Sequence, residues 1–496
     1  MRSLDGTSVV VVGAGVGGLS TACYLADAGA DVLVLEKNDQ LGGRASVLER
    51  DGFRFDMGPS WYLMPDVFER FFGHFDRTPS DYYELTHLDP HYRVFYKDGD
   101  AIDVTGDVER TTELFDSYEA GAGEAFERYL EKSRENYEVG MEHFVYEDRS
   151  RLRDFLDLDV ARNARGLSLL GSMQGHVEDY FDHPKLQQLV QYSLVFLGGS
   201  PKNTPALYNL MSHVDFNLGV WYPDGGIASV IDAFVALGRE LGVEYETGAP
   251  ATAIEGSAGG FAVETPGGDR RADLVVSNAD YAHTEQELLE PGRRGYDADY
   301  WESRTYAPSA FLLYLGVEGD VDDLAHHSLV LPTDWDRHFE QIFDEPAWPT
   351  DPAYYVCAPS KTDDSVAPDG HSALFVLVPI APALEDDPES LARYRESILA
   401  DLAANAGTNL RDRIVLEETF CVSDFADRYN SFRGTALGLA HTLRQTAPFR
   451  PSRRSKAVDG LYFTGSYTTP GIGVPMCLIS GQHTAETVAA DRGNSG

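Results

Sequence analysis

A run of valines followed at once by closely spaced glycines constrains the fold of this chain more than any other feature. Residues 9–12 are all valine, which predicts a fully buried strand. The segment 13–18 then reads Gly-Ala-Gly-Val-Gly-Gly, residues 19–28 suit a helix, and a second apolar run over 32–35 ends at Glu36. This order of strand, glycine turn, helix, strand and acid predicts a βαβ unit that binds a dinucleotide.

Each part of such a turn has a physical role. Gly13 permits the tight turn, Gly15 lets a pyrophosphate approach the backbone, and Gly18 lets the helix pack close to the sheet. The free N–H groups at the helix N-terminus and the helix dipole favour the phosphates. Glu36 is predicted to accept hydrogen bonds from an adenosine ribose, and we include the adjacent Lys37 among the predicted cofactor contacts.

The next segment distinguishes FAD from a nicotinamide cofactor. Two more glycines and an arginine stand just after the second strand, where a nicotinamide dehydrogenase normally builds its next βα unit. Such a segment can wrap the rest of an extended FAD, with the arginine near the pyrophosphate or the flavin. We therefore predict FAD and expect contacts from Gly43, Arg44, Gly58, Pro59 and Ser60.

These motifs are similar to those of a known family. The Glu-x5-Gly-Gly-Arg run over 36–44 resembles the FAD-dependent amine oxidase-like superfamily. The segment 460–475 resembles the C-terminal motif of carotenoid desaturases of the bacterial phytoene desaturase type. Further similar stretches lie between the two ends, at 219–226, 276–280, 324–327, 358–370 and 424–425. The resemblance therefore runs along nearly the whole chain.

The resemblance implies an α/β fold with three parts, in line with roughly three domains for 496 residues. A discontinuous Rossmann-like FAD-binding domain would comprise residues 1–70, 222–285 and 455–496. A mixed α+β substrate domain would comprise 71–115 and 286–454, and a helical membrane-facing subdomain 116–221.

The resemblance also implies further FAD contacts, with some departures from the family pattern. Because Pro250 has no N–H to donate, Ala251 is the expected contact near the adenine. Ser466 and Tyr467 replace the small residues usual in the family, and Met476 stands where the family has glycine. The expected C-terminal contacts are Gly465, Ser466, Gly473, Val474 and Met476.

The activity implied by the resemblance is that of an FAD-dependent carotenoid desaturase, phytoene desaturase-like, acting on a C40 polyene. FAD accepts a hydride, and a carboxylate can take the proton or stabilise the cation left on the substrate. Asp154 aligns with an acidic residue proposed as a base in the family, although Asp157 replaces the family's arginine three positions later. Quinone or oxygen would reoxidise the flavin.

Three other functions remain open. The same scaffold suits a later carotenoid step, such as 3,4-desaturation, or a carotenoid isomerase. It also suits a non-catalytic prenyl-binding carrier, which the intact phosphate turn disfavours. An amine oxidase is the third alternative, and it should surround its flavin with an aromatic cage.

Composition and motif searches narrow the partners and the location. The chain has 80 acidic and 40 basic residues, a net charge of −40 that disfavours nucleic acid and is typical of a halophilic cytoplasm. We expect no metal, because no HExxH motif occurs and the adjacent His326 and His327 should not both face one ion from a strand. No secretory signal or spanning segment is evident, so we expect a cytoplasmic protein peripheral to the membrane. The apolar stretch 186–197 suits either a membrane-dipping helix or an ordinary buried one.

Overall fold

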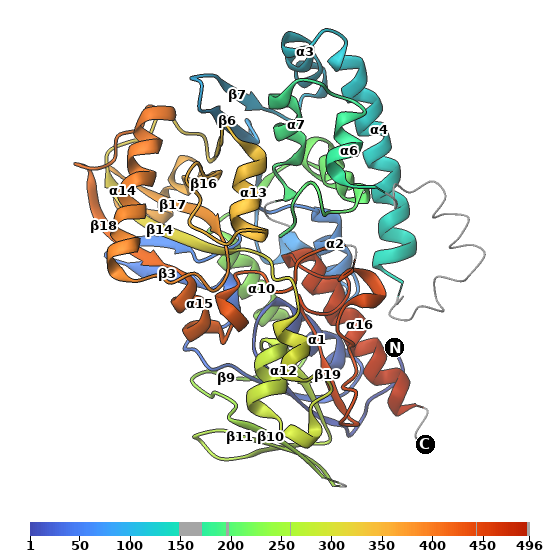
Figure 1. Cartoon of the computed structure of the whole chain (residues 1–496). Helices are drawn as coiled ribbons and strands as arrows, with labels where there is room; N and C mark the ends of the chain where they lie inside the picture. Colours follow the sequence, from blue (N-terminus) through green and yellow to red (C-terminus); the bar gives the residue numbers. More distant parts are fainter. Residues whose placement is uncertain (148–170, 195–197, 258, 443, 494–496) are drawn as a thin grey trace.

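The computed structural model describes residues 1–147, 171–194, 198–257, 259–442 and 444–493 (Figure 1). The two ends of the chain lie on the same side of the molecule (Figure 1). The predicted base Asp154 lies outside the described residues.

A five-stranded parallel sheet contains the valine run and collects strands from distant parts of the chain. Its order is β19 (Leu461–Phe463), β13 (Leu274–Ser277), β1 (Ser8–Val12), β2 (Asp31–Leu35) and β9 (Glu244–Glu246). In the centre, Val10 pairs with both Leu33 and Val275. The sheet therefore cannot form until segments more than 400 residues apart have met.

The two faces of this sheet bury different layers because alternate residues of a strand point to opposite sides. Val9 and Val11 belong to a core with α1 (Val16–Asp27), α10 (Ile227–Glu240) and α16 (Val474–Arg492). Val10 and Val12 face a second core, which includes residues of the antiparallel sheet β10 (Ala253–Ser257), β11 (Gly260–Glu264) and β12 (Arg270–Ala272).

A seven-stranded mixed sheet forms the second unit, at the left of Figure 1. Its order is β18 (Ile414–Phe420), β14 (Ser309–Glu318), β17 (His371–Ile380), β16 (Tyr354–Cys357), β15 (His327–Leu331), β6 (Tyr92–Tyr96) and β7 (Ala101–Val104). Only β15 and β6 pair in parallel. The helix α14 (Pro388–Asn405) packs on one face, and the cavity described below borders the other.

A group of helices lies over the top of the molecule in Figure 1. It comprises α3 (Val108–Tyr118), α4 (Ala122–Gly140), α6 (Met173–Glu178), α7 (Pro184–Gln191) and α9 (Leu210–His213). The remaining helices of four or more residues and short strands are β3 (Val47–Arg50), β4 (Phe53–Asp56), α2 (Pro65–Gly73), β5 (Leu85–His87), η3 (Met141–Val145), η5 (Ala206–Asn209), η6 (Val214–Leu218), β8 (Trp221–Pro223), η7 (Thr284–Leu288), α12 (Ala298–Glu302), α13 (Trp335–Phe343) and α15 (Val422–Tyr429).

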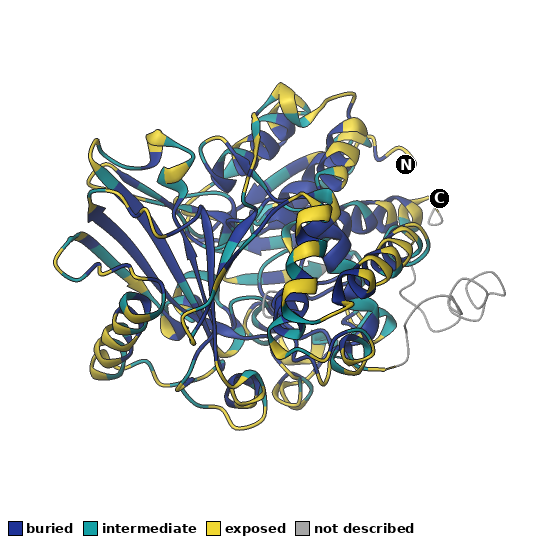
Figure 2. Cartoon of the chain, turned by 90° about the horizontal axis from the view of Figure 1, so that it is seen from above, coloured by how far each residue is buried: buried dark blue, intermediate teal, exposed yellow. Residues whose placement is uncertain are grey.

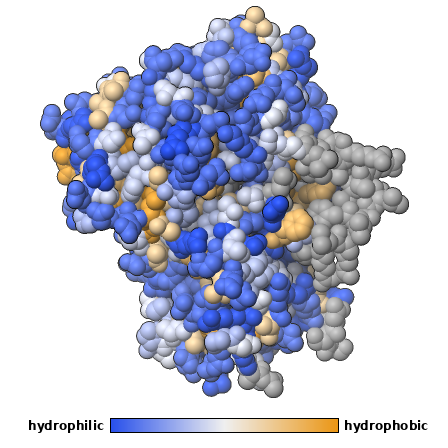
Figure 3. Space-filling view, viewed as in Figure 1, coloured by the Kyte–Doolittle hydropathy of each residue, from blue (hydrophilic) through white to orange (hydrophobic). Residues whose placement is uncertain are grey.

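The predicted α/β fold class is confirmed by these sheets and helices, whereas the exact domain boundaries stay a prediction. Figure 2 shows the strands buried in the interior and the outer faces of the helices exposed. The face in Figure 3 is mostly hydrophilic, as expected for a chain with twice as many acidic as basic residues. Among the described helices, none has the length and apolarity needed to cross a membrane.

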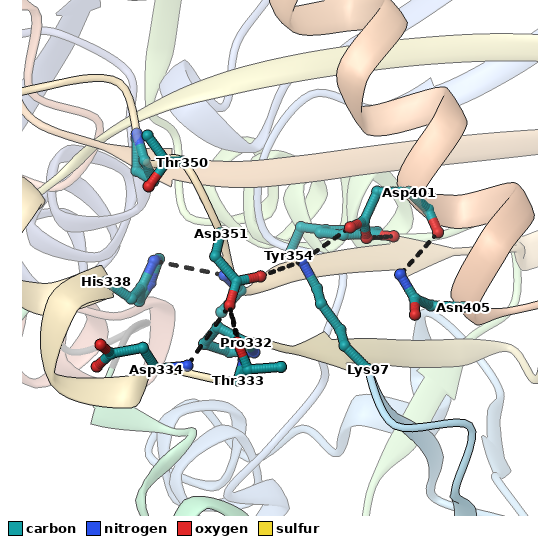
Figure 4. Close-up of polar contacts among 12 residues, drawn as sticks. Lys97, Pro332, Thr333, Asp334, His338, Thr350, Asp351, Tyr354, Asp401 and Asn405 are labelled. Carbon is teal, nitrogen blue, oxygen red and sulfur yellow. Dashed lines mark hydrogen bonds and ion pairs between the residues drawn. The ribbon is translucent and has the colours of Figure 1, made fainter.

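A buried lysine ties the edge of the seven-stranded sheet to α14 (Figure 4). Lys97 follows β6, and only 6% of its side chain is exposed. Its Nζ lies 2.8 Å from Asp351 Oδ1 and 2.9 Å from Asp401 Oδ2. The Tyr354 hydroxyl donates to Asp401 as well, at 2.7 Å. Burial alone would raise the pKa of Asp351, but the hydrogen bonds from Lys97 and Thr333 hold it below its usual value.

We predict that Lys97→Met lowers the free energy of unfolding by about 2–3 kcal/mol, because two carboxylates then lose a buried cationic partner. Lys202→Met is the matched control, since Lys202 pairs with Asp336 where both side chains are more than half exposed. Its loss should amount to less than about 1 kcal/mol. Urea unfolding of both variants measures the difference, and equal losses would contradict a structural role for Lys97.

Candidate cofactor and substrate cavity

Both ends of the chain border one cavity of about 670 Å³. Gly15 from the turn after β1 and Val474 from the start of α16 both line it. The segments 42–45, 57–61 and 249–251 add further walls. The convergence follows from the parallel sheet, because β1, β13 and β19 all end at this edge.

The glycine turn leaves no room for side chains. A Cβ on Gly15 would lie 2.9 Å from the side-chain Nδ2 of Asn278, and one on Gly17 would lie 2.8 Å from the Cα of Gly465. A Cβ on Gly13 would lie 3.1 Å from the backbone carbonyl carbon of Asn278. Gly13 adopts a φ of +97°, which L-residues rarely adopt. Gly18 packs directly on the backbone of the turn, since a Cβ there would lie 2.2 Å from the Gly13 carbonyl oxygen. The backbones of three distant segments thus touch here.

The helix that follows this turn offers unpaired N–H groups at the cavity. Gly15 is the N-cap residue of α1 and supplies no side-chain cap. Gly473 has the same position at the start of α16. The N-termini of a 12-residue and a 19-residue helix therefore both meet the cavity, an arrangement that suits anionic groups such as a pyrophosphate.

Glu36 is buried and fixes the end of β2 against the glycine turn. Its Oε2 accepts a hydrogen bond from Ala14 N, and its Oε1 accepts from the backbone and side-chain nitrogens of Asn38, each at 2.9 Å. Ala251 lines the same cavity. Lys37 also lines it, but its ammonium donates to the Asp427 carbonyl and to Asn430 Oδ1. These bonds place the charge of Lys37 beside the end of α15.

The Gly-Gly-Arg segment packs against the first turn. A Cβ on Gly43 would lie 3.1 Å from Gly15 Cα, and one on Gly58 would lie 2.6 Å from the Arg44 carbonyl oxygen. Arg44 donates to Ser431 Oγ at 2.6 Å, while its buried Nε has no partner among the described residues. A buried guanidinium donor without a partner suits an anionic cofactor. Pro59 and Ser60 line the cavity, and Ser60 bonds to the Tyr355 hydroxyl at 2.8 Å.

The C-terminal segment lies against the same turn. A Cβ on Gly465 would lie 2.6 Å from Asn278 Oδ1. Tyr467, a departure from the family pattern, is buried and donates its hydroxyl to Asp280 Oδ2 at 2.6 Å. A Cβ on Gly438 would lie 3.2 Å from the Tyr467 ring, so this glycine makes room for it. Ser466, Gly473, Val474 and Met476 line the cavity as predicted for cofactor contacts.

Apolar side chains line the rest of the cavity, and the sequence analysis did not identify them. They come from the loop after β4, from α2 and α15, from η3, η5 and α9 in the helical part of the molecule, and from the seven-stranded sheet. No contiguous motif joins them. They include Trp61, Leu63, Met64, Phe68, Met141, Phe144, Val145, Leu207, Leu210, Met211, Leu312, Leu377 and Phe425. One cavity therefore combines a polar, glycine-lined end with an extended apolar arm.

Comparisons with known proteins agree with this architecture. A model of the flavin containing amine oxidoreductase family matches residues 16–489. The chain belongs to this family. A carotenoid 3,4-desaturase of Haloarcula japonica is 69% identical over 493 residues, covering 99% of this chain and 100% of that protein. A zeta-carotene-forming phytoene desaturase of Myxococcus xanthus is 35% identical over 490 residues, covering 98% of this chain and 94% of that protein.

Two solved structures share the fold of this chain. A putrescine oxidase bound to putrescine superposes with a TM-score of 0.62 at 18% identity, covering 98% of this chain and 99% of that one. An oxidoreductase from Methanosarcina mazei gives a TM-score of 0.61 at 18% identity, covering 97% and 100%. The predictions of an FAD cofactor and of an oxidoreductase are confirmed. The roles of individual residues in holding FAD stay predictions, as does a role for Asp154.

The prediction that His326 and His327 cannot both face one ion is wrong. His326 precedes β15 and His327 begins it, so the two side chains do not alternate as in a strand. Their ring nitrogens and the Cys357 sulfur all lie within 4.8 Å of one another. Burial lowers the pKa of His326 to about 3 and that of His327 well below its usual value. It raises the pKa of Cys357 to about 12, so burial favours the neutral form of all three groups. That the protein holds no metal stays a prediction.

We predict that Gly15→Val abolishes FAD binding, because its side chain would meet Asn278 and fill the place of the pyrophosphate. The affinity should fall at least about tenfold. Gly73→Ala is the control, since a Cβ there meets nothing within 4 Å. The flavin absorbance per mole of purified protein measures the result, and a flavin-loaded Gly15→Val protein would contradict the assignment.

Proposed function

We propose that this chain is an FAD-dependent carotenoid desaturase and that its step is a 3,4-desaturation. The observation that carries this proposal is 69% identity along the full length of a carotenoid 3,4-desaturase, against 35% for the phytoene desaturase. The proposed step differs from the phytoene desaturation that we expected first from the motifs, and both are carotenoid desaturations. It is the alternative of a later carotenoid step on the same scaffold.

The apolar arm of the cavity supports a polyene substrate. A C40 polyene has few polar groups to recognise, so its binding relies on burial of apolar surface against side chains such as Leu210, Met211 and Leu377. The same side chains exclude water from the reacting carbons. When bound, FAD accepts the hydride that leaves the substrate. The glycine turn, Glu36 and Arg44 would hold and orient it.

The other two functions have less support. The likeness to putrescine oxidase concerns the fold alone, at 18% identity. A carrier without flavin turnover has no use for a complete dinucleotide-binding site. The glycine turn and the two helix N-termini are nevertheless present, and Arg44 Nε has no partner within the described part of the chain. A desaturase uses both the cradle and the apolar arm.

The location and the electron acceptor form part of the same proposal. A carotenoid dissolves in the bilayer, so the enzyme would take it up at the membrane surface while remaining peripheral. Quinone or oxygen would then reoxidise the flavin. The acidic surface is in keeping with a concentrated salt solution, where screening weakens self-repulsion.

Pigment analysis in two expression hosts tests the proposal. One host accumulates phytoene, and the other accumulates a longer polyene whose 3,4 bond is still saturated. We expect a new, more conjugated pigment in the second host and unchanged phytoene in the first. Conversion of phytoene would instead assign the earlier step. No new pigment in either host, with flavin-loaded protein present, would reject the desaturase.

A further inference from the structure

One buried carboxyl group stands out in the apolar part of the cavity. Asp215 lines the cavity and is only 5% exposed. Its Oδ2 accepts hydrogen bonds from the hydroxyls of Tyr92, at 2.7 Å, and Tyr192, at 3.2 Å. Its Oδ1 is buried and has no partner among the described residues. Burying a polar atom without a hydrogen-bond partner costs free energy, so such an atom calls for an explanation, for example a bound group that it contacts.

A π-helical turn orients the side chain of Asp215. Asp215 belongs to the π-helical segment η6 (Val214–Leu218), which continues α9. Single π-helical turns of this kind recur at functional sites, because they redirect a side chain from its regular helical position. Here Tyr92 comes from β6 and Tyr192 from the end of α7, so three separate elements converge on one carboxyl group.

The other carboxyl groups of the described cavity lining are engaged or exposed. Both oxygens of Glu36 accept hydrogen bonds at the glycine turn. Asp280 accepts from His283 N through Oδ1 and from Tyr467 through Oδ2. Glu147 is exposed to solvent. Asp215 is therefore the buried carboxyl group of this lining that retains an oxygen for a substrate.

We propose that Asp215 is a catalytic residue that accepts the proton released in desaturation. This inference rests on the proposed function. Two C–H bonds on adjacent substrate carbons break. One hydrogen leaves with both bonding electrons as a hydride, which reduces FAD by two electrons. The other leaves as a proton to Asp215 Oδ1, and its bonding electron pair becomes the second bond of the new C=C.

The electrostatic environment suits a base at neutral pH. Burial raises the pKa of Asp215 to about 7, although the hydrogen bonds from Tyr92 and Tyr192 act in the opposite direction. The pKa values of both tyrosines lie well above 10, so they remain neutral donors. A carboxyl group with a pKa near 7 is partly ionised at neutral pH and takes up a proton readily. The same burial that makes the carboxylate costly makes it a stronger base.

Asp215→Asn tests the proposal, because it keeps the shape of the side chain and removes its basicity. We expect unchanged flavin content and unchanged polyene binding, measured by quenching of flavin fluorescence. Anaerobic bleaching of the flavin by the polyene should slow at least about 100-fold. Asp154→Asn, measured alongside, examines the residue suggested by the family resemblance.

The outcomes separate this proposal from the proposed function. If the wild-type protein bleaches with the polyene and Asp215→Asn bleaches as fast, the proposal is overturned. It is also overturned if Asp154→Asn alone loses the activity, or if Asp215→Asn no longer binds the polyene. If none of the carotenoids tested bleaches the flavin of the wild-type protein, the proposed function itself fails.

Tyr92→Phe distinguishes a base from a residue that is only structural, because it changes the pH dependence of the rate only if Asp215 accepts the proton. Removing this donor destabilises the charged carboxylate, so the pKa of Asp215 rises and the rate reaches half its maximum at higher pH. We expect an upward shift of about one pH unit in the rate of flavin bleaching. Tyr354→Phe is the matched control, because Tyr354 donates to Asp401 outside the cavity lining. Its profile should match that of the wild type, and equal profiles for both variants would overturn the role of Asp215.

Discussion

Close contact between three backbones is the constraint on which the rest of the structure depends. The turn at residues 13–18, the segment at Asn278 and the C-terminal Gly465 approach so closely that side chains at Gly15, Gly17 or Gly465 would collide with Asn278 or with backbone. Parallel pairing of β1 with β13, and of β13 with β19, sets this approach. The helices α1 and α16 then begin at the same cavity, and the cofactor end of the site follows from that geometry.

The two ends of the cavity need surfaces of opposite polarity. A phosphate-binding end needs exposed N–H groups and a guanidinium, whereas a polyene needs a dry wall. The turns that follow the strands of the parallel sheet supply the polar end. The apolar arm is built from several other elements: the loop after β4, α2, α15, η3, η5, α9 and the seven-stranded sheet. Asp215 lies in that arm, where the low polarity that favours the substrate also raises the basicity of the carboxyl group.

The cofactor end could be predicted from the sequence because its determinants are local. Gly13, Gly15, Gly18 and Glu36 fall within one βαβ unit, where spacing alone fixes geometry. Asp215 could not be found in this way, since its tyrosine partners lie 123 and 23 residues away and a π-helical turn orients it. The expectation for His326 and His327 failed for a related reason, because it assumed that both residues lie within a strand.

Tyr467 explains how a family member can depart from a motif and keep the fold. A tyrosine side chain needs more space than the small residue usual in the family. Gly438, which has no side chain, leaves room for the buried ring, and the Tyr467 hydroxyl donates a hydrogen bond to Asp280. Asp280 is thereby occupied and cannot act on a substrate, which leaves the proton-accepting role to a carboxyl group elsewhere in the cavity. A substitution at the cofactor end thus bears on which carboxyl group is available for the chemistry, although Tyr467 and Asp215 lie on different elements.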